Sequence, residues 1–298
     1  MTPEPSHDPS AYPEFAVTAD LIVFTIRDGR FKVLLVERGQ PPFLGRWALP
    51  GGFLREDESA EDAAHRELAE ETGLDLSVAH LEQLATFSDP NRDPRQRVVT
   101  VAFWAILPHL GRVRGGTDAA RAEWFDVAEV EAAIADLEDQ PGGHLAFDHD
   151  EILTTALTRA RDKLEYTTLA VKFCPDEFTL TDLRLVYEAI WNVPVDPRNF
   201  VRKIKGAITP LEEATHGAGD GTWSEPEASK AWSMQLLEQR QRPTTFDASP
   251  ANQAPTLHAD AESTAPPVRR GRRPSFYSWS GKEVLSPPFK RPGPKNEV

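Results

Sequence analysis

Three glutamates in the first third of the chain have the spacing expected of metal ligands. They are Glu67, Glu70 and Glu71. Residues three and four apart share one face of a helix, so these carboxylates should point the same way. Such a cluster of like charges destabilises a bare helix, whereas Mg²⁺ prefers oxygen ligands, relieves the repulsion and bridges carboxylates to substrate phosphates. The alternative interpretation is a solvated acidic face.

The residues around these glutamates would position them. Leu68 lies on the opposite side of the expected helix and can anchor it to a sheet. Glu58 and Arg66 can form an ion pair that fixes the loop entering the helix. The backbone of Gly51 and Gly52 can approach metal or phosphate closely, because glycine has no side chain. The segment therefore predicts a helix that presents carboxylates to a phosphate-containing substrate.

The same segment matches the Nudix box. The pattern is Gly, five residues, Glu, seven residues, and then Arg-Glu-aliphatic-x-Glu-Glu-x-Gly-aliphatic. The matching residues are Gly52, Glu58, Arg66, Glu67, Leu68, Glu70, Glu71, Gly73 and Leu74. Chance agreement at so many spaced positions is negligible, so the chain resembles the Nudix hydrolases.

This resemblance implies an α/β fold, a Nudix α/β/α sandwich with a mixed sheet, and hydrolysis of a nucleoside diphosphate linked to another moiety. By the family pattern, Glu67 and Glu71 would be the principal Mg²⁺ ligands, with Mn²⁺ as an alternative ion. Glu70 would share the metal or activate water, and Gly52 would lie at the metal. The bound metals would polarise phosphoryl oxygens and lower the pKa of the attacking water.

The segments that flank the box narrow the substrate. Residues 38–39, 45–53 and 87–97 resemble the branch of the family that recognises ADP-ribose, which implies cleavage to AMP and ribose 5-phosphate. Four arginines could offer bidentate contacts to phosphate or ribose oxygens, and the alternative for the 87–97 loop is a solvated turn. These arginines are Arg38, Arg92, Arg95 and Arg97.

The general base of the implied reaction is left open by the sequence. In this family it can come from outside the box. Asp89, Asp93 and Glu123 are equal candidates.

Alternating strand and helix patterns should position these residues. A loop rich in Pro and Gly, 38–50, precedes the metal-binding helix. That helix has a sequence typical of a capping box at Ser59 and Asp62, and it should end at Gly73, where a positive φ is needed. The expected strands are 15–26, 31–37, 81–87, 98–107 and 123–127, and the expected helices are 59–72 and 148–166.

The second half of the chain contains a further resemblance. Residues 145–153, 163–173 and 178–204 resemble the C-terminal region of a Nudix subgroup in which a winged-helix module follows the Nudix domain. Some members of that subgroup are transcriptional regulators of NAD metabolism that sense ADP-ribose. The sequence also predicts two closely spaced short helices here, the second of them capped by Asp196.

The second of these short helices could bind DNA. Four of its residues could meet phosphates or base edges in a major groove. They are Arg198, Asn199, Arg202 and Lys203. Basic and acidic residues nearly balance between positions 163 and 205, so the alternative is a small dimerisation or stabilising domain. Residues 269–279 look like the returning wing strand, after an insertion that departs from the subgroup pattern.

The expected domain boundaries follow from these patterns. The Nudix domain is expected at 14–145 and a winged-helix-like domain at 146–213, completed by the wing strand. The N-terminus 1–13, the insertion 214–267 and the basic tail 280–298 are expected to be disordered, because their composition supplies little apolar surface to bury.

Composition limits the class of protein. The net charge of −14 favours bound metal cations, while the basic C-terminal end could attract phosphates. The apolar run 21–24 is too short to span a bilayer, and residues 1–13 lack the features of a signal peptide. Cys174 is the only cysteine, so no intrachain disulfide can form and a reducing cytoplasm fits best.

Two functions are therefore expected. The intact box favours a Mg²⁺-dependent hydrolase that acts on ADP-ribose or another nucleoside-diphosphate derivative. The alternative is an ADP-ribose-sensing regulator of NAD metabolism that binds double-stranded DNA. One protein can do both, since the activities belong to different domains. We expect a homodimer without a membrane partner.

Overall fold

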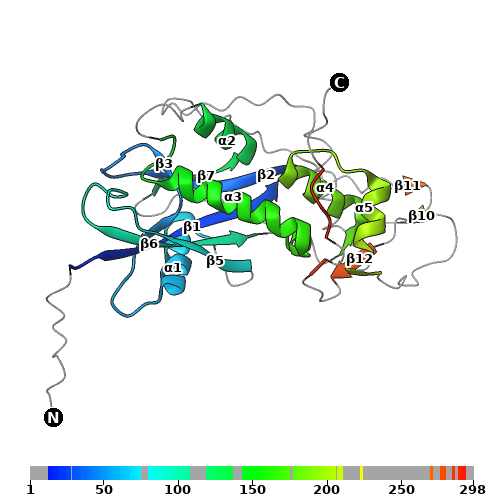
Figure 1. Ribbon diagram of the computed structural model, residues 1–298, viewed down its shortest axis with the longest axis horizontal. Coiled ribbons are helices and arrows are strands. Elements are labelled where there is room, and N and C mark those ends of the chain that lie inside the picture. The colour runs from blue at the N-terminus through cyan, green and yellow to red at the C-terminus, as the bar shows by residue number, and fades with distance from the viewer. Residues whose placement is uncertain are drawn as a thin grey trace, which may run out of the picture.

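The N-terminal half of the chain forms one mixed sheet between two layers of helix, and the C-terminal half adds a small helical domain at one end (Figure 1). The computed structural model describes residues 13–27, 29–74, 80–107, 119–136, 143–174, 177–205, 207–210, 222–223, 269–270, 276–279, 284–285 and 288–292.

The sheet has the order β3-β2-β1-β6-β5, with β4 also paired to β1 and β7 to β2. Strands β1 and β6 run parallel and the other pairs are antiparallel, which confirms the expected mixed sheet. The strands are β1 (Ala16–Arg27), β2 (Arg30–Arg38), β3 (Trp47–Ala48), β4 (Gly51–Phe53), β5 (His80–Phe87), β6 (Val98–Ile106) and β7 (Ala119–Asp126).

Both faces of the central strand β1 are buried, which explains its nearly continuous apolar sequence. Leu21 and Val23 pack with Leu68 of helix α1 (Ala60–Thr72) in one hydrophobic cluster. Ile22 and Phe24 belong to another cluster, which contains residues of α2 (Val127–Ala135) and α3 (His149–Tyr166). The sheet is therefore the middle layer of an α/β/α sandwich.

Helix α1 begins and ends as its sequence predicts. Ser59 accepts a hydrogen bond from the backbone of Asp62, whose side chain accepts one from the backbone of Ser59 in return. Gly73 ends the helix with a φ of 71°, a left-handed conformation that glycine adopts without strain. Ala63, Ala64 and Leu68 are buried against the sheet, which leaves the glutamates on the remaining surface.

The structure also contains elements that the sequence patterns did not indicate. Strand β3 lies within the expected loop 38–50, and β4 follows directly after that loop. Both are too short to produce a recognisable alternation of apolar and polar residues. Helix α2 follows β7 directly and was not expected, because its nine residues are shorter than most amphipathic helices.

The C-terminal domain has the strand order β8-β12-β9. Its elements are the 3-10 helix η2 (Leu169–Phe173), β8 (Phe178–Thr179), α4 (Leu180–Trp191), α5 (Pro197–Ile204), β9 (Ile208–Pro210) and β12 (Phe276–Trp279). Thr179 caps α4 and Asp196 caps α5, where Pro197 occupies the first turn. The chain order β8-α4-α5-β9-β12 is that of a winged helix.

The returning wing strand is shorter than the expected 269–279. Only β12 pairs with β9. Strand β11 (Arg269–Arg270) pairs instead with β10 (Thr222–Trp223), in a separate two-stranded ladder. The insertion thus separates β9 from β12 in sequence while the two strands lie side by side.

Part of the expected basic tail is packed on the folded domain. Leu285 and Phe289 are buried, and their backbone N–H groups donate to the carbonyls of Tyr166 and Glu165 at the end of α3. The Phe289 ring lies 5.3 Å from Tyr187 and 5.5 Å from Phe200, between centroids. These residues of the tail belong to the core of the winged helix.

The Nudix sheet and the winged helix share one hydrophobic cluster. Phe31 of β2 meets Phe173 of η2 edge to face, with 6.0 Å between ring centroids. The two domains are therefore in direct contact through packed side chains.

Among the described residues, no helix combines the length and apolar character needed to cross a membrane.

Candidate active site

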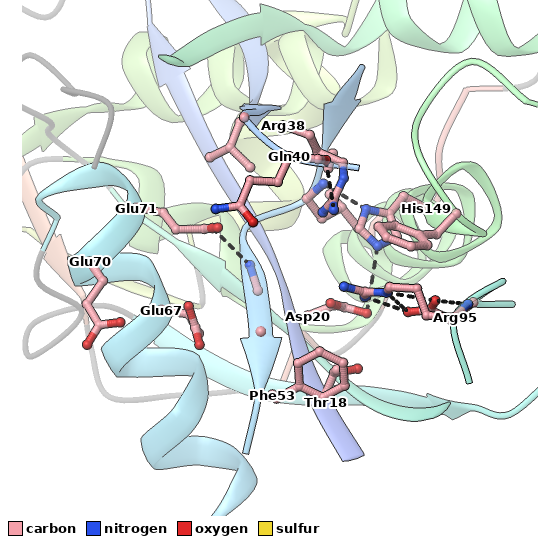
Figure 2. A pocket seen from close by; sticks show the side chains of 18 of the residues that line it. Thr18, Asp20, Arg38, Gln40, Phe53, Glu67, Glu70, Glu71, Arg95 and His149 are labelled. Carbon is pink, nitrogen blue, oxygen red and sulfur yellow. Dashed lines mark hydrogen bonds and ion pairs between the residues drawn. The ribbon is translucent and has the colours of Figure 1, made fainter. Parts of the chain in front are cut away.

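A cavity of about 470 Å³ lies between α1, the sheet and the residues that lead into α3 (Figure 2). Glu67, Glu70 and Glu71 of α1 line one wall. Asp20 of β1 and His149 of α3 lie on the opposite side. The structure thus brings together acidic groups from segments far apart in the sequence.

Glu71 is the most deeply placed of the three box glutamates. The Gly51 N–H donates a hydrogen bond of 3.0 Å to its Oε2. Burial raises the pKa of Glu71 to about 8, against the lowering effect of the Gly51 hydrogen bond, and the charges of Glu67 and Asp20 raise it further. A nearby cation would favour the charged form of this carboxylate.

Gly52 is required where Glu67 approaches β4. A Cβ atom at position 52 would lie only 2.2 Å from Oε1 of Glu67, so any other residue would push the carboxylate away. Burial raises the pKa of Glu67, although hydrogen bonds from Arg66 act to lower it. The glycine of the box therefore leaves space for a carboxylate in this structure.

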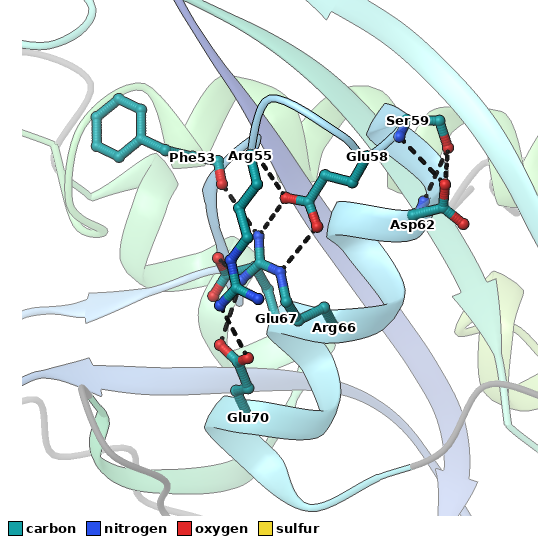
Figure 3. Close-up of polar contacts among 8 residues, drawn as sticks. All are labelled: Phe53, Arg55, Glu58, Ser59, Asp62, Arg66, Glu67 and Glu70. Atoms are coloured by element: carbon teal, nitrogen blue, oxygen red, sulfur yellow. Dashed lines mark hydrogen bonds and ion pairs between the residues drawn. The ribbon is translucent and has the colours of Figure 1, made fainter.

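Arg66 lies at the centre of the acidic cluster (Figure 3). Its guanidinium donates to both oxygens of Glu58, at 2.6 and 2.9 Å, which is the ion pair that the sequence predicts. The same group donates to Glu67 at 2.5 Å and to Glu70 at 3.2 Å. Hydrogen bonds from Arg66 lower the pKa of Glu58 to about 2. Arg66 also donates a hydrogen bond to the Phe53 carbonyl, so it links the loop and β4 to α1.

The chemistry of this donor set fits a divalent cation that prefers oxygen. The three box carboxylates are among the residues that line the cavity, and Glu67 and Glu70 already contact a cation, the guanidinium of Arg66. Within the described parts of the chain, no three His, Cys, Asp or Glu side chains converge as metal ligands in the present arrangement. Glu67 and Glu70 would have to turn from Arg66 toward the metal.

Two of the four expected substrate arginines, Arg38 and Arg95, line the cavity with partly exposed side chains, and Arg95 pairs there with Asp93 at 2.6 Å. Arg38 lines the cavity with its guanidinium 4.7 Å above the Phe147 ring, and it donates to the Pro42 carbonyl. Arg95 lines it between two aromatic rings, 5.3 Å from Phe53 and 5.6 Å from Phe147. Both present cationic groups where a phosphate could bind.

The other two arginines are engaged differently. Arg92 borders the cavity, but its side chain is only 4% exposed and donates to Asp148 at 2.7 and 2.8 Å and to Asp20 at 3.1 Å. Arg97 lies outside the cavity and donates to the carbonyls of Ser88 and Asp89. The structure therefore gives Arg92 and Arg97 structural partners.

The three candidates for the general base also differ in position. Asp93 lines the cavity, where hydrogen bonds from Arg95 outweigh the effect of burial and lower its pKa. Asp89 accepts a hydrogen bond from the Asn91 backbone in an exposed turn. Glu123 is half-buried on β7 and pairs with Arg121 at 2.9 Å.

Sequence reasoning missed three residues that shape the cavity. Asp20 is the only acidic residue of the mostly apolar strand β1, and this isolated negative charge was the signal that could have revealed it. Phe147 and His149 gave no signal of this kind. Nδ1 of His149 accepts a 2.9 Å hydrogen bond from the Leu49 N–H, which fixes the helix start beside the cavity.

Helix α5 presents a polar surface to solvent. Phe200 and Ile204 are buried, whereas Arg198, Asn199 and Arg202 are exposed and Lys203 is half-buried. Arg202 donates to the side chain of Asn199 at 2.7 Å. The expected DNA-contacting residues thus share the outer side of this helix.

Comparison with known proteins agrees with both parts of the structure. Residues 16–145 match the model of the NUDIX domain, and residues 170–221 match that of the NrtR DNA-binding winged helix domain.

Individual relatives show the same combination. The chain is 34% identical over 197 residues to the ADPR responsive transcriptional repressor NtrR of Acinetobacter baylyi, covering 65% of this chain and 74% of the relative. It is 41% identical over 123 residues to an ADP-ribose pyrophosphatase of Methanocaldococcus jannaschii, covering 41% of this chain and 63% of that one. The crystal structure of Shewanella oneidensis NrtR complexed with a 27mer DNA is 30% identical and has a TM-score of 0.53, covering 66% of this chain and 89% of that one. This chain belongs to the Nudix family, in the group that carries an NrtR-type winged-helix domain.

Proposed function

We propose that this chain is a Mg²⁺-dependent hydrolase that cleaves ADP-ribose to AMP and ribose 5-phosphate. The observation that carries this proposal is the set of box glutamates, which lines one cavity together with Arg38 and Arg95. A relative of the Nudix domain is named as an ADP-ribose pyrophosphatase, which supports the choice of substrate.

The residues of α1 would hold the metal. Glu67 and Glu71 would be the main ligands, and Glu70 would share the metal or orient water, with Mn²⁺ as an alternative ion. A bound Mg²⁺ supplies Lewis acidity and lowers the pKa of its water. Arg66 keeps Glu58 and the loop in place while Glu67 and Glu70 turn to the ion.

The arginines would orient the diphosphate. Arg38 and Arg95 approach the cavity from the side opposite α1, so the phosphates would lie between cationic side chains and the metal-binding helix (Figure 2). Guanidinium groups bind phosphate oxygens in a bidentate manner, which fixes the bond to be cleaved relative to the attacking water.

The substrate is tested by incubating the full chain with Mg²⁺ and a panel of ADP-ribose, NADH, dinucleoside polyphosphates and 8-oxo-dGTP. We expect ADP-ribose to be hydrolysed faster than any triphosphate, with AMP and ribose 5-phosphate as products. A strong preference for 8-oxo-dGTP would remove the substrate assignment.

A second proposed function is regulation of transcription. The observation in its favour is the winged-helix order β8-α4-α5-β9-β12 with α5 exposed. We propose that α5 enters the major groove of a promoter of NAD metabolism and that ADP-ribose weakens the complex. A homodimer would place two copies of α5 on successive grooves. A cytoplasmic location, which suits both functions, stays a prediction.

Linkage gives a direct test of this second function. If ADP-ribose weakens DNA binding, DNA must weaken ADP-ribose binding by the same factor. We expect equal factors from anisotropy titrations in the two directions, with EDTA present to prevent hydrolysis. DNA affinity that ADP-ribose leaves unchanged would contradict regulation.

A further inference from the structure

Helix α3 joins the cavity to the winged-helix domain. Its N-terminal end lies beside the cavity, and it crosses the sheet toward α4 (Figure 1). His149 in its first turn lines the cavity, while Leu164 near its other end belongs to the core shared with the winged helix. A change at one end can therefore reach the other through a single rigid element.

The N-terminal end of α3 is held by a partly buried ion pair. Asp148 is the N-cap residue of the helix, yet its side chain makes no capping hydrogen bond. Both of its carboxylate oxygens accept instead from Arg92, at 2.7 and 2.8 Å. An N-cap aspartate normally accepts from backbone N–H groups of the first turn, so Asp148 has two competing uses.

The residue before Asp148 is strained. Phe147 has a φ of 57°, a left-handed conformation that is unfavourable for an aromatic residue. Its ring contacts Arg38, Arg95 and Phe43 around the cavity. Strained residues of this kind persist only where their surroundings hold them, so release of Asp148 would let this turn relax.

Arg92 is the group for which Asp148 and a ligand would compete. It borders the cavity, and its neighbours there are acidic, with Asp20 at 3.1 Å. A diphosphate brought into this cavity adds negative charge close to the guanidinium. Phosphate accepts from arginine in the same bidentate manner as a carboxylate, so it can replace Asp148 as the partner of Arg92.

The other end of α3 is tied to the winged helix. Nε of Arg161 donates to the Ile190 carbonyl at 3.2 Å, and the indole N–H of Trp191 donates to the Arg161 carbonyl at 3.3 Å. Arg161 also forms two hydrogen bonds with Glu131 of α2, at 2.6 and 2.7 Å. A shift of α3 would therefore move α4, and α4 packs on α5 through Tyr187 and Phe200.

We propose that Asp148 is a ligand-operated switch between the cavity and the DNA-binding domain. In the arrangement that the structure shows, Asp148 is paired with Arg92. When the phosphates of a nucleoside diphosphate accept hydrogen bonds from Arg92, Asp148 turns to cap α3. The resulting shift of α3 alters the position of α4 and α5. The identity of the ligand rests on the proposed function, whereas the switch itself does not require hydrolysis.

The test uses an Asp148→Asn variant, because asparagine caps helices well but cannot form the ion pair with Arg92. This variant should adopt the switched state without ligand. Hydrogen–deuterium exchange would be measured for α4 and α5, with EDTA and with or without saturating ADP-ribose. We expect the ligand to change exchange at least twofold in the wild type. Ligand-free Asp148→Asn should already show the changed rates, and added ligand should change them little.

Glu151→Gln is the matched control, since it removes one exposed charge from the same first turn and should respond as the wild type does. If Asp148→Asn does not fold, Arg161→Lys tests the contact between α3 and α4 without altering the cavity. There the ligand should still change exchange in the first turn of α3, but no longer in α4 and α5.

Two results would overturn the switch. One is identical hydrogen–deuterium exchange rates of α4 and α5 in the ligand-free wild-type and Asp148→Asn proteins. This comparison does not depend on the identity of the ligand. The other is a ligand-induced change in the exchange of α4 and α5 that is as large as in the wild type, in Asp148→Asn or, if that variant does not fold, in Arg161→Lys. Failure to hydrolyse ADP-ribose or to bind promoter DNA, with the exchange pattern as expected, would contradict the proposed function alone.

Discussion

Arg66 shows how one side chain can organise an acidic site. It neutralises Glu67 and Glu70 where they would otherwise repel each other, and it fixes Glu58 at the entrance to α1. The network lets the helix fold before metal binds. A divalent metal ion would then compete with Arg66 for carboxylates that are already positioned.

Loss of a single box carboxylate should stop catalysis without unfolding the protein. We expect Glu67→Gln and Glu71→Gln each to lower the turnover of ADP-ribose at least ~100-fold at saturating Mg²⁺, because each removes a metal ligand. Glu61→Gln is the control, since Glu61 is exposed on the same helix outside the cavity. Near-normal turnover of both variants, with unchanged melting temperatures, would refute the metal-binding role.

The buried His149 should make stability depend on pH. Burial lowers its pKa, against the attraction of Asp20 and Asp148, and Arg92 and Arg38 lower it further. The unfolded chain therefore binds the proton more readily, so the stabilisation is complete above the unfolded pKa of about 6.5 and is lost as pH falls below it.

Denaturant titrations between pH 5 and 8 would measure this effect. Asn can accept the Leu49 hydrogen bond without titrating, so His149→Asn should show a smaller loss of stability in this range. Equal pH profiles for the two proteins would assign the acid sensitivity to another group.

At the scale of elements, α1 and α5 were predicted from the sequence because their signals are local. Capping residues and the glutamate spacing lie within one or two helical turns. The cavity wall opposite α1 has no such signal. Arg92 meets Asp20 and Asp148, which are 72 and 56 residues away, so only the packed sheet reveals that this arginine is buried.

Helix α5 should carry the salt-dependent part of DNA binding. We expect Arg198→Ala/Arg202→Ala to weaken promoter binding at least ~10-fold at low salt and to reduce the slope of log affinity against log salt by about two. Arg159→Ala/Lys290→Ala removes the same charge from outside α5 and is the control. Equal, weak binding of promoter and scrambled DNA by all three proteins would favour a stabilising or dimerisation role for this domain.

At the scale of the molecule, the tail completes the winged helix. Phe289 packs among Tyr187, Trp191 and Phe200, and Arg291 donates to the Trp191 carbonyl at 2.8 Å. Composition alone suggested a disordered tail, because the tail is rich in charged residues and prolines and composition does not show that its Phe289 is buried. The shared core with Phe31 and Phe173 was also beyond sequence patterns, because it joins elements distant in the chain.

Removing this aromatic should destabilise the whole winged helix. We expect Phe289→Ala to lower the free energy of unfolding by about 3–5 kcal/mol, the usual effect of deleting a buried phenylalanine. Lys290→Ala, at an exposed neighbouring position, should change it by less than about 0.5 kcal/mol. Equal stability of the two variants would show that the tail does not contribute to the fold.

The position of β12 has a consequence for synthesis of the protein. This strand pairs with both β8 and β9, yet it is translated only after residues 211–275. While the ribosome makes that stretch, the Nudix sheet can already be complete. Strands β8 and β9 still lack their partner strand, and unpaired strand edges of this kind promote aggregation. Any nascent chain that stops before residue 276 would then carry a finished cavity and no finished DNA-binding domain. The proposed DNA binding would be acquired only in the last moments of translation.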